Sequence, residues 1–360
     1  MKVGIFVPIA NNGWILSTSS PQYKPTWEFN RDVVQLAEKH GMDFALAMVK
    51  LRGWGGATEF WDYAHESFTL MAGLAVSTER IKLYASIPVL AMQPAIVARM
   101  TSTIESMAPG RFGVNIVSGW AEGEYSQMGI WPGEEWFGKR YDFSSEYVTV
   151  LRDLLERGRS DFKGEFFTMD DCVLQPQPST PIEIVGAGQS DRGMQFCAEH
   201  CDFNFVLGNG VNNPGAHAAN ASGLQEKAAQ TGRDVNTYVT TMVIAAETDE
   251  EAWARYEDYA AHADLEAIAK MTNQGNVDAR AGSDSTARHM AAPEGSWRLN
   301  MACVVGSYEN VARTLDEMAE VPGTGGLMFV FDDWFRGIEE WGTRVQPLMK
   351  SRVEEVAALA

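Results

Sequence analysis

The stretch Phe112-Gly113-Val114-Asn115-Ile116-Val117-Ser118 is a short, almost continuously apolar run that is interrupted by one amide, Asn115. Runs of this kind are typical of strands that are buried on both faces of a parallel sheet. Seven further runs of similar length and composition lie on either side of it. They cover residues 2–8, 43–49, 81–87, 182–186, 203–207, 238–245 and 326–331.

Helical patterns separate these runs. In the stretch 27–40, for example, Val33, Val34, Leu36 and Ala37 are the apolar positions of the helical pattern. The other helical stretches are 66–76, 95–107, 143–155, 191–200, 216–229, 310–319 and 334–349. Strand–helix alternation repeated eight times predicts parallel strands joined by right-handed crossovers, and therefore an α/β protein with a (β/α)8 TIM barrel.

A doubly wound open sheet is the alternative fold. It is disfavoured because the first run leads into Asn11-Asn12-Gly13-Trp14, which is not the glycine-rich turn of dinucleotide-binding sheets. The 360 residues show no compositional break, and TIM barrels range from about 200 to over 400 residues. We therefore expect one domain over residues 1–360, with a hairpin-like insertion at about 159–180 and a polar excursion at about 264–300.

The charge of the chain excludes several classes of partner. Lys and Arg number 29 against 48 Asp and Glu, which gives a net charge of −19. Such a surface repels phosphate backbones and anionic lipids, so we expect no nucleic-acid or membrane partner. No run approaches the roughly 20 apolar residues of a membrane span, and the start lacks the pattern of a signal peptide. These features predict a cytoplasmic protein.

Cysteine and histidine residues give no sign of a metal site. The four cysteines form no disulfide framework, and Cys197 and Cys201, although spaced as neighbours on a helix face, are more simply read as small buried residues. No histidine pair has metal-ligand spacing with a carboxylate partner. There is no Gly-x-Ser-x-Gly nucleophile motif either. Since the sequence shows neither a metal-ligand pattern nor a nucleophile motif, demanding chemistry by this protein would require an organic cofactor.

Polar residues at the ends of the predicted strands are the candidates for that chemistry, because TIM barrels place their active sites at the carboxyl ends of the strands. Lys50 directly follows the second run, Ser86 lies in the third and Asn115 in the fourth. A buried amide needs hydrogen-bond partners, so Asn115 serves either a core network or a polar ring at the barrel mouth. Lys50 either reaches water or faces a ligand.

Two further segments suit a flat ligand that carries a phosphate. Ser190 follows Gly186-Ala187-Gly188-Gln189 at a helix start, where free N–H groups and the helix dipole favour phosphate; it also suits a simple N-cap. The stretch 120–141 is rich in aromatic residues, which suit an aromatic ligand or merely anchor the loop. Within it, Arg140 and Tyr141 are placed to reach phosphate or ribityl oxygens.

The chain resembles the bacterial luciferase-like flavin monooxygenases. The resemblance rests on residues 3–9, 11–14, 21–23, 50–53, 94–100, 110–115, 127–133, 187–191 and 306–308. Segments 11–14 and 127–133 are similar to those of the family members that act on pyrimidines. The resemblance implies that FMN is contacted by Val49, Lys50, Asn115, Glu124, Arg140, Tyr141 and Ser190.

The same resemblance implies the reaction. Reduced FMN, supplied by a separate NAD(P)H:flavin reductase, and O2 would open the ring of uracil, thymine or a related pyrimidine between N3 and C4. The product would be ureidoacrylate, initially as its peracid. Asn115 and Ser86 would hold oxygen species through their amide and hydroxyl, and Lys50 would stabilise negative charge. We also expect the protein to form a homo-oligomer.

Some positions depart from the pyrimidine pattern. Ser86 stands where threonine is expected, and residues 87–93 and 207–210 differ more. Alternative functions are therefore a monooxygenase of a small sulfone or alkanesulfonate, for which Arg52 is the candidate anion ligand, a deazaflavin-dependent dehydrogenase, and a non-catalytic flavin-binding protein.

Overall fold

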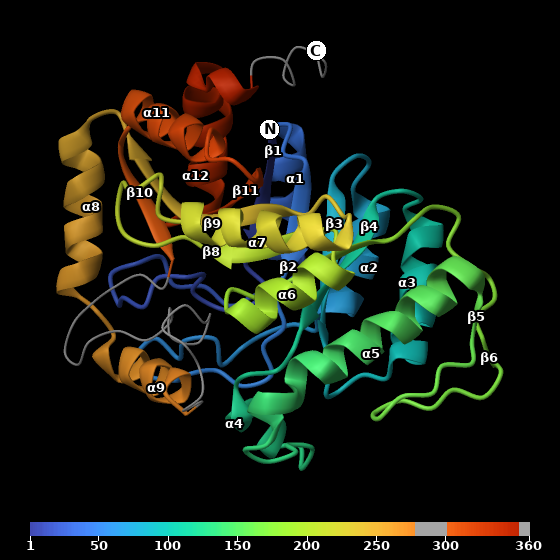
Figure 1. Cartoon of the computed structure of the whole chain (residues 1–360). Coiled ribbons are helices and arrows are strands. Elements are labelled where there is room, and N and C mark those ends of the chain that lie inside the picture. The colour runs from blue at the N-terminus through green and yellow to red at the C-terminus, as the bar shows by residue number, and fades with distance from the viewer. Residues whose placement is uncertain (278–300, 353–360) are drawn as a thin grey trace.

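Eight parallel strands close into a barrel in the computed structural model of this chain, which describes residues 1–277 and 301–352 (Figure 1). Neighbouring strands follow the order β1, β2, β3, β4, β7, β8, β9, β11, and β11 pairs again with β1. Their bounds are β1 Lys2–Val7, β2 Phe44–Ala47, β3 Lys82–Pro88, β4 Phe112–Val117, β7 Glu183–Gly186, β8 Phe203–Leu207, β9 Asn236–Ala246 and β11 Thr324–Phe331. Each overlaps a predicted strand, so the TIM-barrel prediction is confirmed.

A ninth strand, β10 (Ala302–Ser307), was missed by the sequence analysis. It pairs in parallel with the second half of β9, from Thr241 to Ala246. The first half of that same strand pairs with β8, which ends at Leu207. Strand β9 is eleven residues long and outruns β8, so its remaining edge needs a partner, and β10 provides it.

Helices surround the barrel, as alternation predicts (Figure 1). The predicted helices are observed as α1 Trp27–Lys39, α2 Ser67–Ser77, α3 Pro94–Met107, α5 Trp136–Arg157, α6 Asp191–His200, α7 Ala218–Thr231, α11 Tyr308–Ala319 and α12 Trp334–Glu340. Local chemistry explains their starts: the Thr26 hydroxyl accepts the Phe29 N–H at the start of α1, where Val33, Val34 and Ala37 face the core.

Several boundaries differ from the predicted ones. Helix α5 begins seven residues before the predicted 143, so that Arg140 and Tyr141 lie inside a helix. Residues 334–349 were predicted to form one helix, but the α-helix α12 ends at Glu340. A π turn, Trp341–Val345, and a 3-10 turn, Gln346–Leu348, follow it. Pro347 lacks the N–H that an α-helix would need there.

Three helices arise where none was expected: α4 Glu122–Ser126, α8 Asp249–Ala261 and α9 Leu265–Gly275. The last of these occupies the beginning of the predicted polar excursion 264–300, and residues 278–300 lie outside the described part of the chain. In the other insertion, β5 Arg159–Ser160 pairs antiparallel with β6 Cys172–Val173.

Stacked aromatic rings fill the amino-terminal end of the barrel. The Tyr238 ring stacks on Phe44 at 4.5 Å and on Phe203 at 4.2 Å between centroids. The Tyr84 hydroxyl donates to Glu183, which also pairs with Lys82 at 2.8 Å. With this end closed by packing, space for a ligand is left at the carboxyl ends of the strands.

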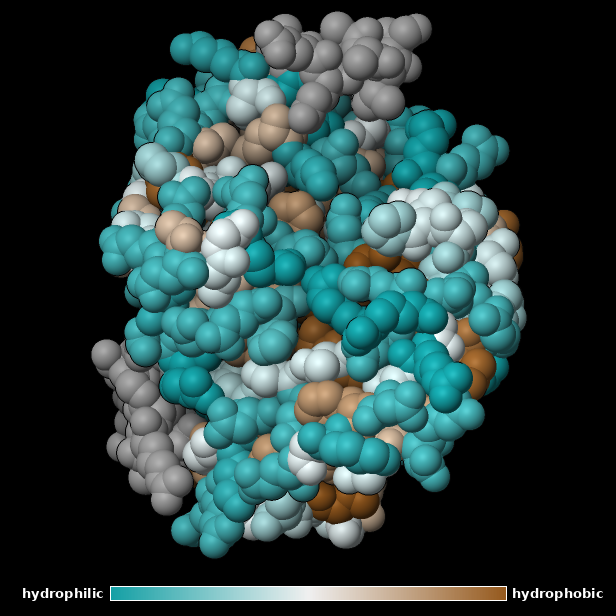
Figure 2. Space-filling model, turned by 45° about the vertical axis from the view of Figure 1, so that its right-hand side comes forward, coloured by the Kyte–Doolittle hydropathy of each residue, from teal (hydrophilic) through white to brown (hydrophobic). Residues whose placement is uncertain are grey.

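The surface agrees with the strongly acidic composition. Figure 2 shows a face on which hydrophilic residues dominate and hydrophobic ones appear as small separate patches. Among residues 1–277 and 301–352, no helix combines the length and the apolar character that crossing a bilayer requires.

Candidate active site

A pocket opens at the carboxyl ends of the barrel strands. Residues from six strands or their ends line it: Phe6, Met48, Val49, Lys50, Ser86, Asn115, Val117, Ser118, Ala187, Phe205 and Leu207. The loops add Trp14, Trp61, Trp120 and Glu124. The structure therefore brings together five of the predicted site residues, Val49, Lys50, Ser86, Asn115 and Glu124.

A chain of hydrogen bonds orients the Asn115 amide within this pocket. The Ser86 hydroxyl donates to the carbonyl oxygen of Ala47 at 2.6 Å, so it accepts the Asn115 Nδ2–H, at 2.8 Å. This order fixes which atom of the amide is the nitrogen. The Asn115 Oδ1 atom is buried and has no partner. Such an atom calls for a donor from a ligand, since buried polar groups are rarely left unpaired.

Lys50 and Glu124 form a buried ion pair in the same pocket. The Lys50 ammonium donates to the Glu124 carboxylate, which also accepts the Leu51 N–H at 3.2 Å. The ammonium lies 3.9 Å from the centroid of the Trp54 ring and 5.4 Å from that of Trp61. Burial lowers the pKa of Lys50, and the charge and hydrogen bond of Glu124 oppose that shift.

The remaining predicted residues form a second group beside the pocket. The Ser190 hydroxyl caps α6 by accepting the Gly193 N–H at 3.2 Å. Burial raises the pKa of the Tyr141 phenol, while Arg140 and hydrogen bonds to Ser190 and Ser118 counteract the rise. Arg140 is itself buried, with its guanidinium 5.2 Å from the Tyr141 ring. Because Ser118 also lines the pocket, this group adjoins it directly.

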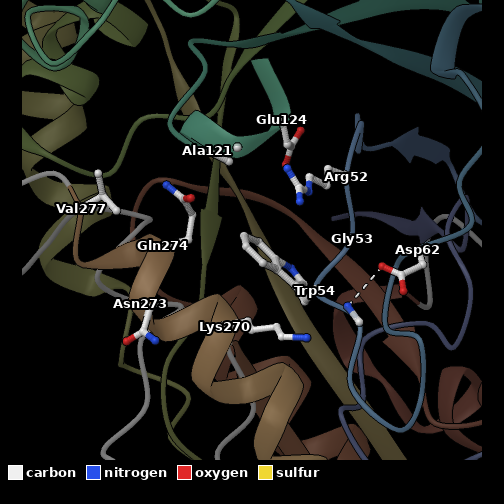
Figure 3. Close-up of a pocket in the computed structure, with 12 residues that line it drawn as sticks. Arg52, Gly53, Trp54, Asp62, Ala121, Glu124, Lys270, Asn273, Gln274 and Val277 are labelled. Carbon is white, nitrogen blue, oxygen red and sulfur yellow. Dashed lines mark hydrogen bonds between the residues drawn. The ribbon is translucent and has the colours of Figure 1, made fainter. Parts of the chain in front are cut away.

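A second cavity of about 600 Å³ lies next to the first (Figure 3). The loop after β2 contributes Trp54 and Asp62, and the latter accepts the Gly55 N–H at 3.1 Å. Glu124 belongs to both cavities. Helix α9 supplies the facing wall, with Lys270, Asn273 and Gln274. This wall was not predicted, because the polar composition of the segment 264–300 indicated a loop.

The aromatic walls of the first pocket were also missed as site residues. Phe6 and Trp14 stack at 4.5 Å between ring centroids, and Trp14 meets Trp61 edge-on at 4.8 Å. Phe205 packs against Phe6 from the opposite strand at 5.4 Å. Phe6 and Phe205 lie within predicted strands and Trp14 lies in the segment 11–14, but none of these features marked the rings as site residues.

Comparison with known proteins agrees with this geometry. The chain matches the family model described as luciferase-like monooxygenase over residues 1–325. It is 56% identical over 352 residues to the pyrimidine monooxygenase RutA of Enterobacter sp. (strain 638), with 98% of this chain and 97% of that protein covered. It is 57% identical, with the same coverage, to RutA of Escherichia coli O127:H6 (strain E2348/69 / EPEC).

Solved structures share the fold at low sequence identity. A riboflavin lyase, RcaE, with modified FMN and riboflavin matches with a TM-score of 0.81 at 18% identity, covering 98% of this chain and 92% of the other. The long-chain alkane monooxygenase LadA matches with a TM-score of 0.79 at 19% identity, covering 98% and 91%. Together with the match of the family model over most of its length, these findings show that the chain belongs to the luciferase-like monooxygenase family.

Proposed function

We propose that this protein is a flavin-dependent monooxygenase that uses reduced FMN and O2 to open the ring of uracil or a close relative between N3 and C4. The observation that carries the proposal is the pocket in which Lys50, Ser86 and Asn115 meet, in a chain 56% identical over nearly its whole length to a pyrimidine monooxygenase.

The residues present suit a flavin. Phe6, Trp14 and Phe205 give the pocket broad apolar walls, as a flat aromatic ring requires. The unpartnered Asn115 Oδ1 atom offers an acceptor to an N–H group of a ring bound there. At the edge of the pocket, Arg140 and the capped start of α6 at Ser190 would hold the phosphate.

Reduced flavin, when bound, supplies the two electrons and two protons that the reaction needs. One pyrimidine, one O2 and this reducing equivalent balance as ureidoacrylate peracid, with the N3–C4 bond broken and a C4–O bond formed. The protein's own contribution is positioning and charge. Lys50 would stabilise the negative charge that develops on the substrate carbonyl, and the rings of Trp54 and Trp61 would keep water from the ammonium.

Ser86 has a different role in this proposal from the one expected from the sequence. Its hydroxyl proton is committed to the Ala47 carbonyl, so it does not donate to oxygen species. Instead it accepts from Asn115 and turns the amide oxygen toward the pocket. We therefore assign Ser86 as a positioning residue and Asn115 as the residue that contacts cofactor or substrate.

The proposal extends to the domain organisation, oligomeric state, location and partner of the enzyme. The enzyme would act as one catalytic domain and a homo-oligomer in the cytoplasm, with a separate NAD(P)H:flavin reductase as its functional partner. No glycine-rich dinucleotide turn occurs in the sequence, so the chain offers no motif for binding NAD(P)H itself.

Single-turnover product analysis tests the function. The protein is mixed anaerobically with photoreduced FMN and uracil, then exposed to O2, and the products are identified by mass spectrometry. Ureidoacrylate or its peracid is the expected product, with one molecule formed per reduced flavin. Complete recovery of uracil, with all reducing equivalents released as hydrogen peroxide, would refute the proposal. Parallel reactions with an alkanesulfonate, assayed for sulfite, test the competing monooxygenase function.

A further inference from the structure

The loop between β2 and α2, residues 51–65, delivers two tryptophan rings to the candidate site. Trp54 lies over the Lys50 ammonium at 3.9 Å, and Trp61 lies 5.4 Å from it. Trp61 also lines the pocket that holds Asn115. Since loops are the most mobile parts of a barrel, the position of these rings depends on whatever holds this one in place.

The backbone of this loop is strained where it presents Trp61. The φ angle of Trp61 is 62° and that of Glu59 is 48°. A left-handed conformation is uncommon for residues other than glycine, and for a bulky side chain it marks an outlier that the surroundings must enforce. The strained loop therefore needs contacts from outside itself.

The segment Asn11-Asn12-Gly13 supplies those contacts. The Asn11 side chain donates to the carbonyl of Glu59 at 2.8 Å and accepts the Tyr63 N–H at 3.1 Å. The Asn12 amide donates to the carbonyl of Thr58 at 2.6 Å. Both asparagines are buried, with 2% and 7% of their surface exposed. These bonds therefore form away from water, where they act as fixed constraints.

The other end of Asn12 is also engaged. Its Oδ1 atom accepts the Tyr23 N–H at 2.9 Å, so the amide bridges two loops. Asn12 has a φ angle of 61°, which asparagine tolerates better than most residues. The following Gly13 carbonyl accepts the Trp61 indole N–H at 2.7 Å. The turn thus holds the strained backbone and the tryptophan ring together.

Thr58 is hydrogen-bonded to two other parts of the chain, Asn12 and Asp264. Its carbonyl accepts from Asn12, while its N–H and its hydroxyl both donate to the buried Asp264 carboxylate at 2.8 Å. Asp264 also accepts the Ala267 N–H at the start of α9. The loop is therefore clamped between the turn after β1 and the helix that walls the second cavity.

We propose that Asn11 and Asn12 are specificity-determining positioning residues: they hold Trp61 in its strained conformation and so set how large a pyrimidine the pocket accepts. This inference rests on the proposed function. It gives the Asn11–Trp14 segment a role that is exerted through the Trp61 loop. Trp14 itself completes the wall by meeting Trp61 edge-on.

Asn12→Gly is the informative substitution, because glycine keeps the left-handed backbone and removes only the amide. Asn30→Ala is the matched control: Asn30 is an equally buried amide that donates to a carbonyl, that of Thr26, but it lies in helix α1. Trp61→Phe is the second test variant, since it keeps a ring and deletes the bond to Gly13. Steady-state kinetics with uracil and with thymine are measured for all four proteins.

The wild type and Asn30→Ala are expected to show the same kinetic constants. In Asn12→Gly and Trp61→Phe, the KM for uracil should rise about five- to tenfold, the size of effect expected from one lost hydrogen bond. The kcat of Asn12→Gly should stay within about twofold. In both variants the kcat/KM ratio of thymine to uracil should increase, because a less firmly held pocket wall accommodates the 5-methyl group.

Three outcomes would overturn the inference. If both test variants match Asn30→Ala in KM and in the thymine-to-uracil ratio, the asparagines have no role in specificity although the proposed function stands. If the wild type does not turn over uracil or thymine, the proposed function fails and the inference fails with it. A loss of kcat alone, with KM and the ratio unchanged, would also count against a specificity role.

Discussion

At the scale of single residues, the polar atoms that already have hydrogen-bond partners determine which atom of the candidate site can contact a ligand. The Ser86 hydroxyl donates to the Ala47 carbonyl and accepts a hydrogen bond from the Asn115 amide. What remains open toward the pocket is the Asn115 Oδ1 atom. One missing partner in an otherwise satisfied network identifies the contact that a ligand must make.

Asn115→Ala should therefore uncouple the reaction. We expect the variant to fold and to bind FMN, but to form about 10²–10³-fold less ring-opened product per unit time, as when a preorganised polar contact is lost. Hydrogen peroxide should replace the missing product in a single-turnover assay. Ser86→Thr keeps the hydroxyl and should retain activity. An Asn115→Ala protein with wild-type product yield per reduced flavin would leave Asn115 with a structural role only.

Lys50 and Glu124 lead to a prediction about stability. Removing one partner of a buried ion pair leaves an uncompensated charge, so Lys50→Met should lower the free energy of unfolding by about 3–5 kcal/mol. The double variant Lys50→Met/Glu124→Gln should recover part of this loss, because no charge is then stranded. Urea denaturation measures both. Equal losses in the single and double variants would mean that the pair is not coupled.

The same lysine predicts a pH effect. Burial lowers the pKa of Lys50 below its ordinary value of 10.5, so the ammonium loses its proton at a lower pH than a free lysine does. If its charge assists the reaction, kcat should fall on the alkaline side, beginning below pH 10.5. The Lys50→Arg variant, which stays charged, should lack this alkaline limb in a pH–rate profile even if it is slower throughout. An alkaline limb that persists unchanged in Lys50→Arg would assign it to another group.

At the scale of helices and strands, topology explains what could be predicted. Lys50, Ser86 and Asn115 were predicted to meet because parallel strands carry their ends to one face of a barrel. The exact partners were not predictable, since the bond from Ser86 to Ala47 and the clamp of Asp264 on Thr58 join residues 39 and 206 positions apart. No local pattern encodes such pairings.

Elements outside the repeating pattern were missed for a related reason. Strand β10 pairs with the part of β9 that extends beyond β8, and this pairing depends on the relative lengths of two strands. Helix α9 follows a good N-cap at Asp264, whose carboxylate accepts the Ala267 N–H at 3.2 Å. That cap was a readable signal, and the polar composition downstream obscured it.

The helix pair α5 and α6 carries a prediction about the cofactor. Arg140 in α5 and Ser190 at the start of α6 adjoin through Tyr141. If they hold the phosphate, Arg140→Ala should weaken FMN binding by about 1.5–3 kcal/mol, or roughly tenfold or more. Riboflavin, which lacks the phosphate, should bind the variant and the wild type alike. Isothermal titration with both ligands separates a phosphate contact from general damage, which would weaken both equally.

At the scale of the whole molecule, stability and chemistry occupy opposite ends of the barrel. At the amino-terminal end, the fully buried Arg352 donates to the Met1 carbonyl at 2.8 Å, the Gly41 carbonyl at 2.7 Å and the Asp43 carboxylate at 2.7 Å. The opposite end holds the pocket and the strained loop. The site can thus carry strain because the scaffold is closed elsewhere.

In the proposed function the pocket at the barrel mouth holds the flavin, and the sequence has no glycine-rich dinucleotide turn for a reducing nucleotide. The chain should therefore turn over only when reduced FMN comes from outside. With NADH and FMN alone, protein that is free of any reductase should form no product, and adding photoreduced FMN should restore it. Because the flavin would pass through solution, reductases of unrelated sequence should serve equally well at matched rates of FMN reduction. Steady turnover with NADH and FMN alone would show that the chain reduces its own flavin, and a strict requirement for one reductase would show that the two proteins must dock. In either case the model of a freely diffusing reduced flavin would have to be abandoned.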